Sequence, residues 1–562
     1  MTKAKLIALY LRTIAHLRGR QIVYRGRNAV RKLRNAYPCS IAANARHPVA
    51  WASVNPTFPF VSRHWIDATE ISKNSFRFLN RSMNCGERIE WDPRGENRLW
   101  RYNLHYFDYL HPGNPLDPAT GIGLMRDWVE KNRPGAANAW DPYPTSLRLV
   151  NWIKYLSRIN PAPSEAFSPV QSAYLQAGRL ERCLEYHLMG NHLFKNAKAL
   201  VFSGVFFKGE DAERWLSRGT GILNNELDEQ ILADGGHFER SPMYHGMVLE
   251  DCLDLLNICA NKSHPRLRKL SDLLRERLPS MMRFLFGMTH PDGRIALFND
   301  AAFGVEVSPR HLAAYYSNLM EVPPPGMPDS FRSFPDSGYF VMAPRTGDRL
   351  IIDCGPIGPD YQPGHAHCDT LSFELSIKGR RVIVDSGCFQ YEDGPIRQYN
   401  RGNSGHNAIS IDGENQSEVW GAHRCAGRAR PLYAGLERKN GDIFFKGAHD
   451  GYKRLKGSPV HHRRIHLSEN VYVIRDILDG HGIHTVESRL HIHPGLSVDS
   501  ASEGAVIRCR GEFLATISSR HAIEKTYGWY CPEFGIQESC CVLKITLPRV
   551  CLPCETGWII RT

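Results

Sequence analysis

The spacing of apolar positions changes once along this 562-residue chain, from a helical period to a strand period. Between about residues 67 and 325, apolar residues recur every three or four positions, the spacing of one helix face. The predicted helical runs, most of them joined by short loops, are Leu175–His187, His192–Phe207, Ala212–Leu232, Met247–Ala260, Leu267–Leu278, Met281–Met288 and Arg310–Met320. We therefore expect an all-α unit of paired helices.

From about Phe334 the chain changes to short alternating apolar runs separated by glycine-containing turns. These predicted strands are Tyr339–Met342, Arg349–Asp353, Leu371–Ile377, Arg381–Asp385, Ala408–Asp412, Asp442–Lys446, Val471–Arg475 and Val542–Thr546. Many short strands with turn signals favour an antiparallel β-sandwich. Five prolines between Pro323 and Pro335 mark the boundary. The prediction is a multidomain α+β chain, with a helical domain at 67–330 and a β domain at 331–562.

Charge distinguishes a third segment, residues 1–66, which holds twelve Lys or Arg and no Asp or Glu. The net charge of the whole chain is also +12, so the rest of the chain is neutral overall. Apolar residues from Leu6 to Leu17 recur at helical spacing between the cations, and an extended connector follows at 36–66. A basic amphipathic helix can lie on an anionic membrane surface. The alternative is a helix docked on the body with its cations solvated.

Composition limits the other partners and the compartment. An apolar content of 42% and a charged content of 23% are those of a globular chain. No nucleic-acid motif is present, so we expect no nucleic-acid partner. The fifteen cysteines, an odd number spread over the chain, indicate mostly free thiols. We find no clear export signal, because Arg12 and Arg18 interrupt the first apolar stretch. Both features favour the cytoplasm.

The stretch Gly364–Leu375 places two histidines, His365 and His367, just before an alternating apolar run. In a strand, residues two apart point to the same face. Neighbouring imidazoles there can share a metal, or one can transfer protons while the other binds a metal. The alternative is a pair of surface histidines at a loop–strand junction.

Two further stretches concentrate polar side chains. In Tyr186–Asn196, Gly190 breaks one helix, and Asn191 and His192 begin the next, where free N–H groups favour an anion such as a carboxylate. In Asp234–His245, Tyr244 is a candidate proton donor or acceptor. Each has a simpler alternative, namely an ordinary helix cap and a tyrosine packed with its hydroxyl satisfied.

A candidate metal site combines His367 with two residues at later strand edges, Asp385 and His406. Two histidines and one carboxylate are a plausible zinc set with an open fourth position. The spacings of 18 and 21 residues match no local metal motif. Mutual hydrogen bonding without a metal fits the spacing equally well.

Five stretches together resemble the heparinase II/III family of polysaccharide lyases, which is related to alginate lyases. They are Gly190–His192, Gly235–Tyr244, His365–Phe373, Val384–Gly387 and His406–Asn407. Residues 140–152 and Leu297–Asp300 also look like this group. The resemblance implies an incomplete (α/α) toroid followed by a β-sandwich. It also implies β-elimination on a uronic-acid polysaccharide, such as a glycosaminoglycan or an alginate-like polymer.

The resemblance also implies roles for individual residues. Asn191, with His192, would neutralise the uronate carboxylate, Tyr244 would be the general acid or base, and His365 would be its partner in proton transfer. His367, Asp385 and His406 would match a structural zinc site. Sugar contacts are predicted for Tyr391, Arg397 and Arg240. Because the two histidines of residues 364–367 then have separate tasks, we expect these residues to form a loop rather than a strand.

Two other functions stay open. One is a zinc-dependent glycan hydrolase that uses the metal set, and the other is a non-catalytic glycan-binding or assembly factor. The basic N-terminal segment is similar to a subgroup found with surface-polysaccharide biosynthesis. The family resemblance implies the periplasm or cell envelope, whereas the absent export signal and free cysteines favour the cytoplasm.

Overall fold

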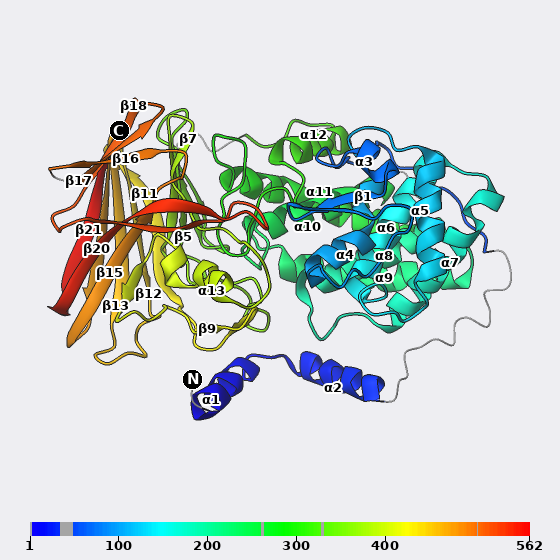
Figure 1. Cartoon of the computed structure of the whole chain (residues 1–562), viewed down its shortest axis with the longest axis horizontal. Helices are drawn as coiled ribbons and strands as arrows, with labels where there is room; N and C mark the ends of the chain where they lie inside the picture. Colours follow the sequence, from blue (N-terminus) through cyan, green and yellow to red (C-terminus); the bar gives the residue numbers. More distant parts are fainter. Residues whose placement is uncertain (1–2, 34–48, 260–262, 327–330, 503) are drawn as a thin grey trace.

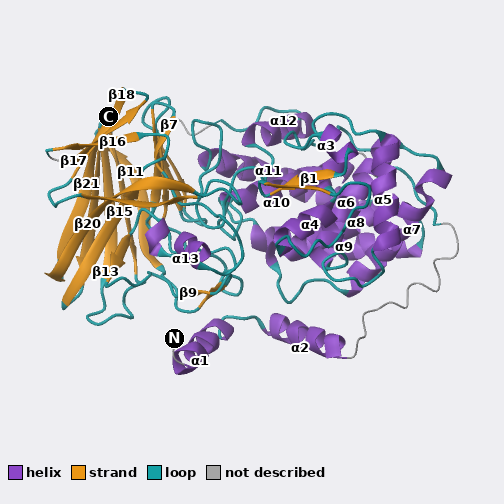
Figure 2. Ribbon diagram, in the orientation of Figure 1, coloured by secondary structure: helices purple, strands orange, loops and turns teal. Residues whose placement is uncertain are grey.

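The computed structural model describes residues 3–33, 49–259, 263–326, 331–502 and 504–562. Part of the predicted connector (36–48) and of the predicted domain boundary (327–330) lies outside the described residues. A helical part and a sheet-rich part lie side by side, in the order that the apolar spacing predicts (Figures 1 and 2). The chain therefore has a mixed α+β fold.

The helical part begins with a short helix and a hairpin and continues as a succession of helices. Its elements are α3 (Ala68–Ser72), β1 (Ser75–Phe78), β2 (Arg81–Asn84), α4 (Arg98–Tyr106), α5 (Pro118–Lys131), α6 (Pro142–Ile159), α7 (Pro163–Arg182), α8 (Gly190–Phe206), α9 (Glu210–Gln230), α10 (Pro242–Cys259), α11 (Pro265–Gly287) and α12 (Pro309–Met320). Helices α8 and α10 are buried along almost their whole length. A helix that is covered all round belongs to the centre of a helical assembly, so these two carry the residues of the interior.

The sheet-rich part consists of antiparallel sheets. The first has the order β3 (Phe331–Phe334), β4 (Tyr339–Met342), β5 (Arg349–Asp353), β6 (Phe373–Ile377) and β7 (Arg380–Ile383). The largest has the order β11 (Pro431–Lys439), β12 (Asp442–His449), β13 (Val460–Ser468), β14 (Val471–Asp479), β21 (Cys554–Arg561), β18 (Glu512–Ser518), β17 (Gly504–Cys509) and β16 (Ser497–Ala501). The third has the order β19 (Glu524–Tyr530), β20 (Glu538–Cys551), β15 (Ile483–His491) and β8 (Ile409–Ile411). Smaller elements are α13 (Pro395–Arg401), β9 (Val419–Trp420) and β10 (Arg424–Cys425).

Burial explains the layering of these sheets. Strands β4, β5 and β6 are buried at every position, as expected for strands covered on both faces. One face packs on Phe284 of α11 and on Met288, which follows that helix, and the other face shares a core with the largest sheet. Strands β13 and β14 instead alternate between more and less buried positions. The sheet of β3–β7 is therefore the layer that joins the helices to the outer sheet.

Polar contacts also fix the two parts against each other. Asp234 accepts hydrogen bonds from the backbone N–H and the hydroxyl of Ser337, at 2.7 and 2.6 Å. The guanidinium of Arg240 donates to the carbonyl oxygens of Phe238, Asp336 and Ser337. Because Arg240 and Ser337 are buried, the junction holds the loops of the sheet-rich part in a defined position over the helices.

The basic N-terminal segment forms two helices where a single helix was predicted. These are α1 (Lys3–Ile14) and α2 (Gly19–Leu33), which lie along one side of the body, across both of its parts (Figure 1). No helix among the described residues is long and apolar enough to cross a membrane. We call α1 and α2 the N-terminal strap.

Candidate active site

A large cleft of about 1880 Å³ lies between the two parts of the body and the N-terminal strap. All four predicted catalytic residues line it: Asn191, His192, Tyr244 and His365. The first two come from the start of α8, Tyr244 from the first turn of α10, and His365 from the loop before β6. Three segments far apart in the chain therefore converge on one space.

The centre of the cleft is an aromatic group around Tyr244. The ring of Tyr244 lies on that of His365, with ring centroids 4.0 Å apart. Its hydroxyl is 3.0 Å from the hydroxyl of Tyr391. Burial raises the pKa of Tyr244 well above its usual value, so its hydroxyl keeps its proton at neutral pH. A buried, protonated phenol next to an imidazole is equipped to donate a proton to a substrate.

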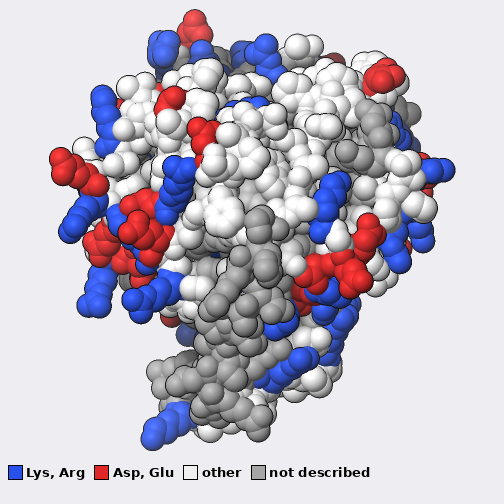
Figure 3. All heavy atoms as spheres, turned by 90° about the vertical axis from the view of Figure 1, so that its right-hand side faces the viewer, with Lys and Arg blue, Asp and Glu red and all other residues white. Residues whose placement is uncertain are grey.

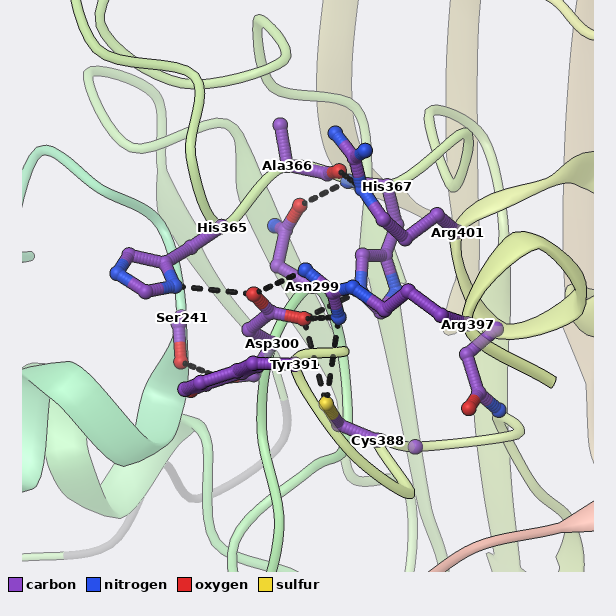
Figure 4. Close-up of polar contacts among 12 residues, drawn as sticks. Ser241, Asn299, Asp300, His365, Ala366, His367, Cys388, Tyr391, Arg397 and Arg401 are labelled. Atoms are coloured by element: carbon purple, nitrogen blue, oxygen red, sulfur yellow. Dashed lines mark hydrogen bonds and ion pairs between the residues drawn. The ribbon is translucent and has the colours of Figure 1, made fainter. Parts of the chain in front are cut away.

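Residues 364–367 form a turn and loop, and the strand begins only at Phe373, which confirms the prediction for this segment. The structure adds a connection between the two histidines. Nδ1 of His365 is 2.9 Å from Oδ2 of Asp300, and Nε2 of His367 is 2.8 Å from Oδ1 of the same carboxylate (Figure 4). Asp300 therefore holds both imidazoles.

Asp300 is fully buried, and its charge is balanced by Arg397. Both terminal nitrogens of Arg397 donate to this carboxylate, one to Oδ2 at 2.8 Å and the other to Oδ1. Burial alone would raise the pKa of Asp300, but Arg397 and the two histidines keep it well below its usual value. The carboxylate stays ionised, so it accepts a hydrogen bond from Nδ1 of His365 and turns Nε2 of that ring to the other side, where Oε2 of Glu239 lies 3.7 Å away.

The sequence assigned no role to Asp300. Its only signal was its place in Leu297–Asp300, one of the stretches that look like the family, because the partners of Asp300 are 65 to 97 residues away in the chain.

Asn191 and His192 present polar groups at the start of α8. Nδ2 of Asn191 donates to both carboxylate oxygens of Glu239 at 3.0 Å, whereas its Oδ1 has no hydrogen-bond partner among the described residues. Nδ1 of His192 is 3.1 Å from Oε1 of Glu185. Burial lowers the pKa of His192, but the negative charge of Glu185 outweighs this and raises it. A positive His192 would attract a carboxylate in the cleft.

Gly190 allows this arrangement because its φ of +57° is strained for any other residue. A Cβ at this position would lie 2.5 Å from Oε1 of Glu239. The glycine therefore lets Glu239 approach the first turn of α8 and hold Asn191.

The predicted metal residues His367, Asp385 and His406 are brought together. All three are buried, and one ligand atom from each lies within 4.8 Å of the others. Nδ1 of His367 and Nε2 of His406 have no hydrogen-bond partner among the described residues. Asp300 occupies the other nitrogen of His367, which is how carboxylates orient metal-binding imidazoles. This donor set fits Zn²⁺.

Of the three predicted sugar-binding residues, only Tyr391 lines the cleft. The prediction for Arg397 is wrong because its guanidinium is fully buried on Asp300. The prediction for Arg240 is wrong because three carbonyl oxygens at the junction between the two parts hold its guanidinium. Sequence position put both arginines near the site but did not indicate which way they point.

Comparison with known proteins gives matches over most of the chain. The family described as Heparinase II/III N-terminus matches residues 73–324, and the family described as Heparinase II/III-like, C-terminal matches residues 326–555. The heparin-sulfate lyase of Bacteroides stercoris is 23% identical over 454 residues, which cover 70% of this chain and 64% of that lyase. This chain thus spans less than two thirds of that relative.

Two other known proteins are similar to this chain, one in sequence and one in structure. FtsZ-localized protein C of Caulobacter vibrioides is 24% identical over 455 residues, which cover 75% of this chain and 74% of that protein. The crystal structure of a heparinase III superposes with a TM-score of 0.68 at 17% identity, covering 92% of this chain and 87% of that one. At this identity, the superposition shows a shared fold.

Proposed function

The chain belongs to the heparinase II/III-like family, and we propose that it is a lyase that cleaves a uronic-acid-containing polysaccharide by β-elimination. The observation that carries this proposal is the convergence of Asn191, Tyr244 and His365 in one cleft. Each comes from a different segment, and Glu239 links them: its carboxylate lies 3.0 Å from Nδ2 of Asn191 and 3.7 Å from Nε2 of His365, whose ring lies on that of Tyr244. Relatives named as heparin-sulfate lyases support the same reaction class.

The reaction begins with the weakly acidic proton on C5, next to the uronate carboxylate. Nε2 of His365 accepts this proton, because Asp300 fixes the other ring nitrogen as the donor. The electron pair of the C5–H bond moves toward the carboxylate, whose added charge a positive His192 stabilises, together with the side-chain N–H groups of Asn191 once they donate to it in place of Glu239. This pair then forms the C4–C5 double bond as the bond from C4 to the bridging oxygen breaks.

The departing sugar oxygen needs a proton, and Tyr244 supplies it from a hydroxyl that burial keeps protonated. The products are a sugar chain with a restored hydroxyl and one with an unsaturated uronate end. Proton exchange between Tyr244 and His365, which lie in ring contact, then restores the starting state.

We further propose that His367, Asp385 and His406 hold a structural zinc ion. The bound ion would supply a fixed cross-link between the strand edges that carry these residues. None of the three lines the cleft, which disfavours a hydrolase that activates water on this metal.

The finer architecture follows the family. We propose that the paired helices form an incomplete (α/α) toroid and that the stacked antiparallel sheets form its β-sandwich partner. The central position of α8 and α10 and the core shared between two sheets support this assignment.

We also propose that the N-terminal strap contacts an anionic membrane surface. Its outward side carries Ile7, Leu11 and Val23, which are 60%, 65% and 65% exposed. A helix packed on a protein usually turns its apolar side inward, so these side chains are suited to a lipid surface. Figure 3 shows Lys and Arg, without Asp or Glu, on the protrusion below the body. Sedimentation with anionic but not with neutral vesicles would support this contact.

A second candidate function is a non-catalytic glycan-binding or assembly factor. It is favoured by the relative named FtsZ-localized protein C, whose name states a location rather than an activity and of which this chain covers 74%. Binding of a uronate polymer without turnover would support this alternative.

The test of the lyase is the ultraviolet absorbance of unsaturated uronate, measured with a panel of uronic-acid polymers. At least one polymer should give product, and Tyr244→Phe and His365→Ala should each lower the rate by about 10²- to 10⁴-fold. Unchanged activity in both variants would overturn the assigned roles. No product from any polymer would contradict the lyase.

A further inference from the structure

The N-terminal strap turns one continuous side toward the cleft. Residues that line the cleft recur at helical spacing along both of its helices: Tyr10, Thr13, Leu17, Gln21, Arg25 and Asn28. Most of these side chains are polar or aromatic, the kinds that contact sugars. The two family models match only from residue 73 onward, so neither of them describes this wall of the cleft.

Contacts on both parts of the body hold the strap in this position. On the sheet-rich side, Arg12 forms an ion pair with Glu418 at 2.8 Å, and Nε1 of Trp420 donates to the hydroxyl of Thr13 at 3.2 Å. At the start of α2, the amide of Gln21, which is 1% exposed, donates to the carbonyl oxygens of Leu188 and Tyr361. The strap therefore spans the cleft and fixes the side chains that face it.

Two arginines line the cleft beside the strap, Arg25 on α2 and Arg424 on β10. The guanidinium carbon of Arg424 lies 4.7 Å from the ring centroid of Trp420 and 5.5 Å from that of Tyr10. Arg25 of α2 lines the same cleft, and its pKa is lowered by burial and by the positive charge of Arg424. Among the described residues, no carboxylate forms an ion pair with either arginine. Stacking on aromatic rings leaves the in-plane N–H groups of Arg424 available for an anion.

His423, which precedes Arg424, lies next to the catalytic group. The ring of His423 lies 5.6 Å from that of Tyr391 and 6.4 Å from that of His365. Arg424 is the following residue. An acidic polysaccharide that places one uronate at His365 would therefore continue along the cleft that Arg25 and Arg424 also line, where another of its sugars can reach them.

We propose that Arg25 and Arg424 form an anion subsite that binds the carboxylate or sulfate group of a sugar adjacent to the one that is cleaved. This inference rests on the proposed function, because it presumes an acidic polysaccharide in the cleft. A bound anion would reduce the repulsion between two positive charges that form no ion pair. The planar guanidinium of Arg424 can donate two parallel hydrogen bonds to a carboxylate or to a sulfate. The strap thus supplies substrate specificity in addition to covering the cleft.

The test is the dissociation constant of a size-defined heparan sulfate octasaccharide, measured by calorimetry in the Tyr244→Phe background to prevent turnover. Arg25→Gln and Arg424→Gln should each weaken binding by about 3- to 10-fold, the size expected when one charged contact is lost. Arg27→Gln is the matched control, because Arg27 lies on the same helix but does not line the cleft. It should leave the constant unchanged.

A desulfated octasaccharide distinguishes the two anions. If the effect of Arg25→Gln persists on it, the subsite binds a carboxylate, and if the effect disappears, the subsite binds a sulfate. Equal binding of the original octasaccharide by all variants would overturn the subsite and leave the lyase intact. The predicted binding pattern in a chain that releases no unsaturated product would support the subsite and overturn the lyase.

Discussion

The buried pair of Asp300 and Arg397 gives the sharpest prediction about how this site is held together. Asp300→Asn keeps the size of the side chain but removes the charge that balances Arg397. Both side chains are fully buried, and removing one partner of such a pair lowers the free energy of unfolding by about 3–5 kcal/mol. Arg397→Met should cost a similar amount, since it leaves Asp300 without its main positive partner.

The double variant should cost less than the sum of the two single changes, by about 2 kcal/mol or more, because no charge is then left stranded. Urea unfolding followed by both fluorescence and circular dichroism measures these differences, provided that the two transitions coincide. Asp360→Asn is a matched control, because Asp360 pairs with Arg428 while itself 61% exposed, and should cost below about 1 kcal/mol. Additivity within about 0.5 kcal/mol would refute the account of Asp300.

Three further predictions concern the surroundings of the site. Gly190→Ala should lower kcat/KM at least roughly tenfold by displacing Glu239 and Asn191, whereas Gly123→Ala, in open space on α5, should not; equal kinetics would contradict this role. Burial raises the pKa of Glu306 from 4.5 to about 8. The folded chain therefore keeps a proton that the unfolded chain releases, and stability falls as pH rises through this window. Melting curves should show that the free energy of unfolding of Glu306→Gln rises relative to that of the parent between pH 4.5 and 8, by at most about 5 kcal/mol. A constant difference in free energy over this range would contradict the prediction. Elemental analysis should find one zinc per chain, lost together with several degrees of melting temperature in His406→Ala, and a well-folded, zinc-free parent would remove the zinc proposal.

The sequence predicts those features that depend on local spacing. The change from a period of about 3.6 to a period of 2 separates the helical part, whose last helix α12 ends at Met320, from the sheet-rich part, whose first strand β3 begins at Phe331. This boundary follows from a short-range pattern, which a single sequence contains. The loop at 364–367, as the structure has it, was predicted instead from the separate tasks that the family resemblance implies for His365 and His367.

Features that depend on long-range contacts were not predictable in the same way. Asp300 contacts residues of two distant loops, and nothing near it in the chain indicates which side chains it meets. Arg397 was expected on the sugar because it follows the metal stretch, but its guanidinium turns inward to Asp300. The strap over the cleft is a further case, since helical spacing predicts an amphipathic helix but not what each of its sides contacts.

The central claim is that Tyr244 and His365 break a glycosidic linkage by elimination, without adding water. Mass spectrometry of the products from a defined uronate oligosaccharide in ¹⁸O-labelled water tests this most directly. The account predicts two products whose masses sum to that of the substrate, one carrying the unsaturated uronate and neither carrying ¹⁸O. A product pair heavier by one water, with ¹⁸O in the new hydroxyl, would contradict it and show hydrolysis.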